Sequence, residues 1–107
     1  MEIRARCPIR TTIEMLGGKW TLLLIHKLKA GPLRPSEIKQ KLPGISDKVL
    51  NDELHFLRTN QLIVRQAPPE KSKKVLYALT DLGREALKII VAMKEFGLSY
   101  EKQVVAG

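Results

Sequence analysis

A set of hydrogen-bonding side chains recurs at about one-turn intervals between residues 46 and 60. Ser46 comes first, and Lys48, Asn51 and His55 follow at spacings that place side chains on one face of an α-helix. An asparagine amide can bond two atoms of adenine, a lysine can reach guanine or a phosphate, and the amino end of a helix attracts phosphate. The pattern predicts that Ser46, Lys48, Asn51 and His55 read base edges in the major groove of duplex DNA. For His55, which lies late in the helix, a position facing solvent is an equal alternative.

Basic residues flank this helix and suit a second task, the neutralisation of phosphate. Arg34 and Lys39 precede the helix, Lys41 being an alternative to Lys39, and Arg65 and a polar loop with two prolines follow it. Cationic side chains in such positions hold the DNA backbone or enter the minor groove. The sequence predicts backbone contacts from six residues: Arg34, Lys39, Arg65, Lys71, Lys73 and Lys74. The alternative for the three lysines is a loop that only exposes its charge to solvent.

The composition favours a polyanionic partner. The chain of 107 residues has 19 Lys and Arg against 11 Asp and Glu, which gives a formal net charge of +8 and an isoelectric point near 9.9. Nucleic acid is the commonest partner of a basic domain, although charge alone also admits anionic membranes and acidic proteins. No stretch approaches the roughly 20 apolar residues of a membrane span. With no signal-peptide pattern and a single cysteine, Cys7, the expected location is the cytoplasm.

The sequence contains no residue set that matches an enzyme active site, a metal site or a cofactor site. His26 and His55 are the only histidines, and they do not form a metal-ligand pattern with the one cysteine. The segment 17–19, Gly-Gly-Lys, lacks the remaining spacing of a phosphate-binding loop, and no serine has a convincing histidine and aspartate partner. Trp20 is expected in the core and not in a ligand pocket. We therefore expect no enzyme, no cofactor and no metal.

The elements that must position these residues follow from apolar periodicity and from glycine and proline breaks. Helices are expected over 11–16, 20–29, 35–42 and 46–60, two short strands over 62–66 and 75–79, and a last helix over about 80–105. Ser46 suits the cap of the fourth helix, and Thr80 or Asp81 that of the last, which Gly97 could bend or end. The fourth helix should pack through a face made of Leu50, Leu54 and Leu57, broadened by Val49 and Phe56.

This order of elements predicts a mainly α (α+β) fold, a winged helix-turn-helix in one domain spanning 1–107. The helix-turn-helix covers about 34–60, with Pro43-Gly44 in its turn, and the wing is a two-stranded hairpin over about 62–79.

Four sequence signatures resemble the HxlR-type winged helix-turn-helix regulators. They are Cys7-Pro8, Leu16-Gly17-Gly18-Lys19-Trp20, Leu42-Pro43-Gly44-Ile45-Ser46 and Tyr77-x-Leu79-Thr80-x-x-Gly83. Pro35 departs from the family, which often has an aromatic residue there, and so does the turn 59–62, Thr-Asn-Gln-Leu. These departures concern local turns.

The resemblance implies a bacterial or archaeal regulator that represses or activates transcription. It also implies a homodimer formed through the terminal helices, with the helix over about 80–105 as the dimerisation helix, and it leaves operator and effector unknown. Cys7 stands where some relatives carry a redox-sensing cysteine, and nearby arginines could lower its pKa. A small residue without a sensing role is the alternative for Cys7. For the whole chain, the alternative is a winged-helix module that binds protein or RNA without reading DNA sequence.

Overall fold

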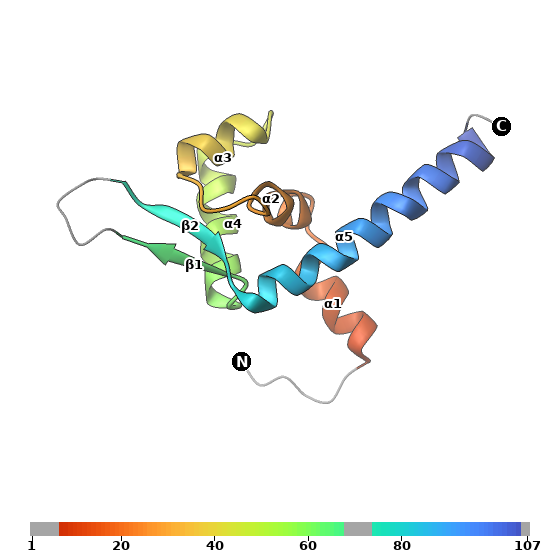
Figure 1. The fold of residues 1–107 in the computed structure, drawn as a ribbon, viewed down its shortest axis with the longest axis horizontal. Coiled ribbons are helices and arrows are strands. Elements are labelled where there is room, and N and C mark those ends of the chain that lie inside the picture. The colour runs from red at the N-terminus through yellow and green to blue at the C-terminus, as the bar shows by residue number, and fades with distance from the viewer. Residues whose placement is uncertain (1–6, 68–73, 106–107) are drawn as a thin grey trace.

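The protein is described by a computed structural model that covers residues 7–67 and 74–105. Figure 1 shows a body of short helices with a two-stranded wing on one side and a long helix leaving it on the other. The elements are α1 (Pro8–Leu16), α2 (Thr21–Lys27), α3 (Pro35–Lys41), α4 (Asp47–Thr59), β1 (Ile63–Gln66), β2 (Leu76–Leu79), α5 (Asp81–Tyr100) and η1 (Glu101–Val105), a π-helical turn. The mainly helical winged helix-turn-helix predicted from the sequence is confirmed.

The helix-turn-helix is formed by α3, a tight turn and α4. Pro35 opens α3, where its missing N–H is not needed, and the Glu37 carboxylate accepts a hydrogen bond from the backbone N–H of Arg34 at 2.8 Å. In the turn, Gly44 has a φ of +94°, a conformation that favours glycine. Ser46 caps α4 as predicted, because its hydroxyl accepts from the backbone N–H of Val49 at 3.1 Å.

The wing is an antiparallel hairpin whose base is tied to the helices. β1 pairs with β2 from Ile63 opposite Leu79 to Gln66 opposite Leu76. Leu33, just before α3, adds a third short partner, because its backbone exchanges two hydrogen bonds with Tyr77 at 3.0 and 2.8 Å. The wing base is therefore joined to the start of the helix-turn-helix. Residues 68–73, which include Lys71 and Lys73, lie outside the described part of the chain.

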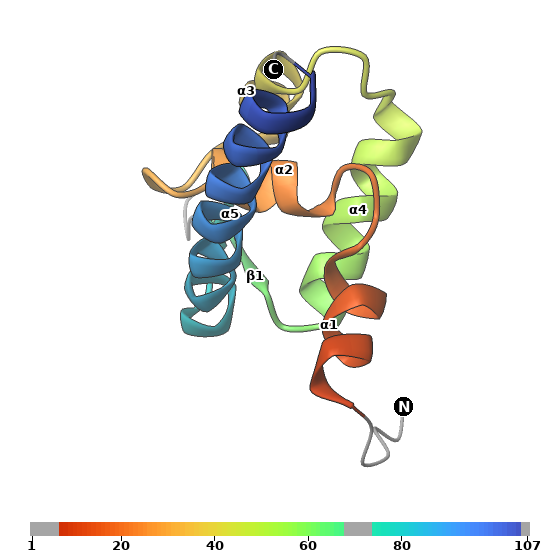
Figure 2. The same cartoon turned by 90° about the vertical axis from the view of Figure 1, so that its right-hand side faces the viewer.

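The core is centred on α2, which lies between α4 and α5 in Figure 2. Leu24, Ile25 and Leu28 are fully buried, and the predicted face of α4 is buried against them and their neighbours through Leu50, Leu54 and Leu57. Val49 and Phe56 do not broaden that face as predicted. They are 36% and 37% exposed and lie beside the buried stripe of leucines.

Two of the expected helix boundaries are wrong. The first helix starts at Pro8 and not at residue 11, since a proline is well suited to a first helical position. Gly97 neither bends nor ends the last helix, which continues to Tyr100. No neighbouring atom comes within 4 Å of the place of a Cβ at Gly97, so its helical conformation meets no steric conflict.

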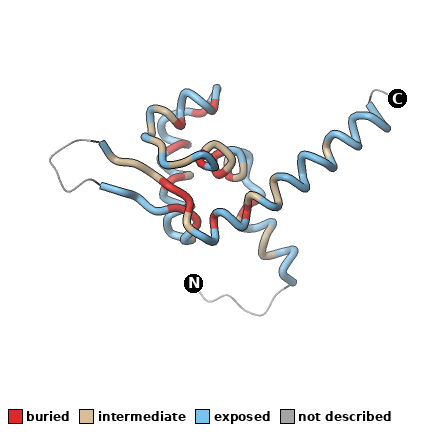
Figure 3. Tube along the Cα trace, viewed as in Figure 1, coloured by how far each residue is buried: buried red, intermediate tan, exposed pale blue. Residues whose placement is uncertain are grey.

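The second half of α5 leaves the body. Thr80 caps this helix, accepting from the backbone N–H of Gly83 at 3.0 Å and donating to the carbonyl of Gln61 at 2.7 Å. Gly83 and Ala86 are buried against the body, whereas residues 91–96 and the turn that follows the helix are exposed (Figure 3). Within residues 7–67 and 74–105, no helix is long and apolar enough to span a membrane.

Candidate nucleic-acid interface

The polar residues predicted to read bases lie on the exposed side of one helix. Ser46 caps α4, and Lys48, Asn51 and His55 are exposed along it, while the leucines of the opposite side are buried. This division anchors α4 to the body and leaves its polar side open. An exposed helix of this kind fits the major groove.

Three cations of the helix-turn-helix are held by carboxylates. Lys48 Nζ lies 2.9 Å from a carboxylate oxygen of Asp52, one turn along α4. Lys39 Nζ of α3 reaches across the turn to Asp47 at 2.7 Å, and Arg34 lies 3.5 Å from Glu37. Helical spacing could have indicated the local pairs Lys48–Asp52 and Arg34–Glu37, but none of the three partners was predicted. No sequence pattern indicated that Lys39 and Asp47 meet.

The cations of the wing base differ from these three in having no carboxylate partner among the described residues. Arg65 in β1 and Lys74 just before β2 are exposed, and neither has an ion-pair partner among residues 7–67 and 74–105. Arg58, near the end of α4, is also exposed and has no carboxylate partner within the same ranges. The sequence analysis did not single out Arg58. The described wing base and the end of α4 thus offer positive charge that no described carboxylate offsets.

A polar contact fixes α4 against α2. The hydroxyl of Thr21, which is 2% exposed, lies 3.3 and 3.4 Å from the two carboxylate oxygens of Glu53 on α4. Burial raises the pKa of Glu53 above its ordinary value of 4.5, and the bond from Thr21 opposes that rise. The carboxylate therefore joins two helices while its charge is only partly hydrated.

Glu53→Gln should make folding less dependent on pH. Because the folded protein binds the Glu53 proton more tightly than the unfolded chain does, the stability that this group contributes is present below pH 4.5 and is lost as the pH rises through the raised pKa. The amide of glutamine carries no charge and still accepts the Thr21 hydroxyl. We expect the variant to show a smaller fall in the free energy of unfolding between pH 4.5 and 7, measured by urea denaturation. Glu101→Gln, at an exposed site, is the control, and an unchanged pH profile in Glu53→Gln would contradict this role.

Cys7 is exposed and immediately precedes α1. Backbone N–H groups of Arg10 and Ile9, in the first turn of α1, lower the pKa of the thiol. The sequence analysis attributed such a shift to nearby arginine side chains; the backbone at the helix start is the cause that the structure gives. The thiolate that reacts with oxidants is therefore favoured here.

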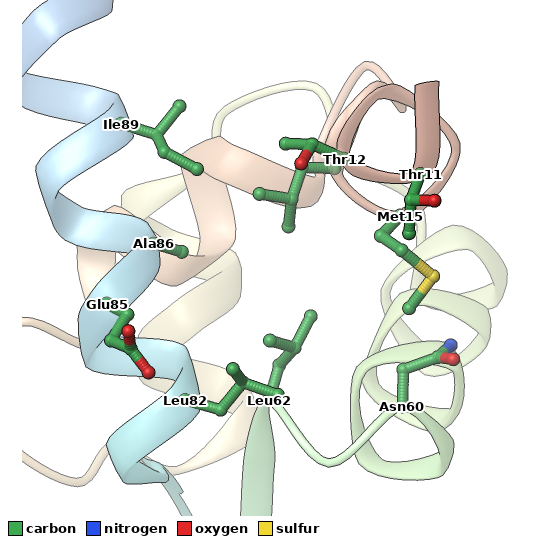
Figure 4. A pocket seen from close by; sticks show the side chains of 10 residues that line it. Thr11, Thr12, Met15, Asn60, Leu62, Leu82, Glu85, Ala86 and Ile89 are labelled. Carbon is green, nitrogen blue, oxygen red and sulfur yellow. The ribbon is translucent and has the colours of Figure 1, made fainter. Parts of the chain in front are cut away.

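A cavity of about 320 Å³ lies between α1, the end of α4, the start of β1 and the first half of α5 (Figure 4). Its walls are mostly apolar, with polar groups from Thr11, Thr12, Asn60 and Glu85; the other lining residues are Met15, Leu16, Leu62, Leu82, Ala86 and Ile89. Asn60 follows the last turn of α4, whereas Ser46 and Lys48 are at its start. The cavity is thus separate from the face predicted to read bases, and sequence analysis did not find it.

Apolar side chains are exposed on both terminal helices. Phe96 is 73% exposed on α5, and Ile9 is 71% exposed on α1. Further exposed apolar residues on these elements and on η1 are Ile13, Val91, Met93, Leu98, Tyr100, Val104 and Val105. Such a concentration is typical of a surface that another protein chain covers.

Comparison with known proteins places this arrangement among transcriptional regulators. The family described as HxlR-like helix-turn-helix matches residues 15–105. An HTH-type transcriptional regulator of Methanothermobacter thermautotrophicus is 36% identical over 94 residues, which are 88% of this chain and 72% of that protein. A crystal structure of a MarR-family transcriptional regulator from Porphyromonas gingivalis W83 is 40% identical, with a TM-score of 0.82 over 92% of this chain and 96% of that one. The redox regulator HypR in its reduced form is 30% identical, with a TM-score of 0.84 over 94% and 98%.

Proposed function

The chain belongs to the HxlR-like helix-turn-helix family of DNA-binding transcriptional regulators, and we propose that it reads a specific duplex sequence with the first half of α4. The observation that carries the proposal is the division of α4, with its leucines buried and Ser46, Lys48 and Asn51 exposed along one helix. In this role Asn51 bonds an adenine edge, Lys48 bonds a guanine or a phosphate, and Ser46 bonds a base edge near the helix start. His55 contacts a base or faces solvent.

The remaining basic residues hold the DNA backbone in this proposal. Arg34 and Lys39 belong to the start and the body of α3, Arg65 and Lys74 belong to the wing base, and Lys71 and Lys73 lie outside the described residues. If each of the six neutralises one phosphate, the logarithm of the binding constant should fall with the logarithm of salt concentration with a slope of roughly −5 per monomer. The chain then acts by occupying DNA, in the cytoplasm, and not by catalysis.

A homodimer formed through α1 and α5 is part of the proposal. The exposed apolar residues of α1, α5 and η1 are of the kind that a second subunit covers, and a symmetric dimer presents two copies of α4. The spacing of two half-sites on DNA then follows from the dimer, typically one helical turn apart.

Cys7 supplies a redox response in this proposal. Its exposure and the lowered pKa of its thiol favour the reactive thiolate, and HypR, which has a similar structure, is a redox regulator. The chain has one cysteine, so a disulfide must join Cys7 of two subunits. Hydrogen peroxide would accept two electrons from the two thiols, form one S–S bond and leave as two waters.

Recovery of genomic DNA fragments by the purified protein tests both sequence-specific DNA binding and the redox response of Cys7. We expect a small set of upstream fragments to be enriched over random duplex under reducing conditions, and the enrichment to change after peroxide treatment. In Cys7→Ser the enrichment should persist and no longer respond to peroxide. Equal recovery of all fragments, with a stable protein or RNA complex instead, would replace DNA reading by the interaction-module alternative. An identical peroxide response in Cys7→Ser would remove Cys7 as the sensor.

A further inference from the structure

We propose that Asp47 and Asp52 are specificity-determining residues, which restrain Lys39 and Lys48 and thereby weaken binding to DNA of random sequence. The inference rests on the proposed function of α4 and concerns how that face discriminates. Both lysines are predicted DNA contacts, and both are already engaged by a carboxylate of α4 in the free protein.

The two pairs differ in what they connect. Lys39 and Asp47 are eight residues apart, and their 2.7 Å contact joins α3 to the first turn of α4. Lys48 and Asp52 are one turn apart on α4 itself, at 2.9 Å. Each ammonium group therefore lies against a carboxylate of the reading helix in the free protein. Each ammonium still has further N–H donors for an acceptor on the groove floor.

These carboxylates change the charge of the reading face. Lys39 and Lys48 contribute two positive charges, and Asp47 and Asp52 contribute two negative ones, so the four sum to zero in a chain of net charge +8. The charge that attracts any duplex therefore resides elsewhere, including the exposed Arg58, Arg65 and Lys74. The first half of α4 gains from DNA mainly when base edges match its hydrogen-bonding groups.

Discrimination arises because complexes with random DNA and with a specific site depend on different contacts. Binding to random DNA depends almost entirely on phosphate neutralisation, whereas a specific complex adds base contacts. In a random complex each lysine can contact a phosphate only by leaving its carboxylate, and exchanging one exposed ion pair for another gives little net gain. In the specific complex Lys48 bonds a base edge through a further N–H while it stays paired with Asp52, and the base contacts offset the release of Lys39 from Asp47 to a phosphate.

The test measures binding of the full chain to labelled duplex of random sequence by fluorescence anisotropy across a salt series. Asp47→Asn and Asp52→Asn should each free one lysine for a phosphate, which raises affinity for random duplex by about eightfold near 0.1 M salt and steepens the salt slope by about one. For a fragment enriched from the genome, affinity should rise by less than about threefold, so the preference for it falls. Glu95→Gln makes the same change of charge on the exposed part of α5 and should raise random binding much less.

The outcomes separate this inference from the proposed function. If random binding is unchanged in both variants, rises no more than in Glu95→Gln, or rises by the same factor as specific binding, the inference is overturned. If the unaltered protein prefers no fragment, the proposed function fails, yet the increase for random duplex would still be measurable. Thermal unfolding followed by circular dichroism checks that all three variants keep the fold.

Discussion

Replacing Gly83 by alanine should lower the free energy of unfolding by about 2–3 kcal/mol, whereas the same change at Gly97 should raise it by about 0.5–1 kcal/mol. Both glycines lie in α5, so helix propensity favours alanine at both sites. The opposite signs arise from what surrounds each Cα.

At Gly83 the helix touches the base of the wing. A Cβ on this residue would lie well inside van der Waals contact of the backbone carbonyl oxygen of Leu62, and close to the Leu79 side chain. The same carbonyl oxygen accepts a hydrogen bond from the backbone N–H of Thr80 at 3.1 Å, so it has little room to shift. At Gly97 no described atom beyond its two chain neighbours and the adjacent helix backbone lies within 4 Å of the added carbon.

Urea denaturation of the two variants measures this contrast directly. Because Gly83 packs where the wing meets α5, its alanine variant should also bind DNA more weakly at temperatures where it remains folded. Equal changes in stability at the two glycines would show that the close approach at Leu62 is not a constraint. A destabilised Gly97→Ala would instead indicate that a second subunit packs closely on that part of α5.

The second large effect is expected at Asn51, where alanine should remove most of the preference for a specific DNA site. A bidentate contact from asparagine to adenine contributes about 1–3 kcal/mol of discrimination, on the order of tenfold to hundredfold in relative affinity. Asn51 is exposed on α4 and makes no hydrogen bond with its side chain within residues 7–67 and 74–105, so the loss should not be accompanied by unfolding.

Competition between an enriched genomic fragment and random duplex measures that preference. The salt slope of Asn51→Ala should stay close to that of the unaltered protein, because no phosphate contact is removed. Thr59→Ala, also exposed on α4 but two turns further along, is the matched control and should keep the preference. A retained preference in Asn51→Ala would move base reading to other residues of the helix.

Local patterns accounted for most of the elements. Ser46 and Thr80 were identifiable as caps because a cap is made by a hydroxyl and the backbone three residues later. The buried face of α4 followed from its leucines at helical spacing, and the wing strands from two short β-branched or aromatic segments with a polar loop between them. Two of the four family signatures, at 42–46 and 77–83, include these caps and the second wing strand.

Features that depend on side chains from distant segments could not be predicted in this way. The contact of Thr21 with Glu53 joins residues 32 apart, and the pairing of Lys39 with Asp47 crosses a turn whose angle is set by packing. The exposure of Val49 and Phe56 likewise depends on which segments pack against α4, and periodicity does not indicate this.

The polar face of α4 could therefore be predicted from the sequence, because helical spacing alone places Lys48 and Asn51 on one side of the helix. The pairing of Lys39 with Asp47 could not, since it depends on how α3 and α4 pack, whereas the pair of Lys48 and Asp52 lies within one turn of α4. The same holds for α5. Its apolar residues are evident in the sequence, but its second half is exposed because contact with the core ends near Ile90. Helix formation is a local property of the chain, whereas pairing and exposure are properties of the packed body.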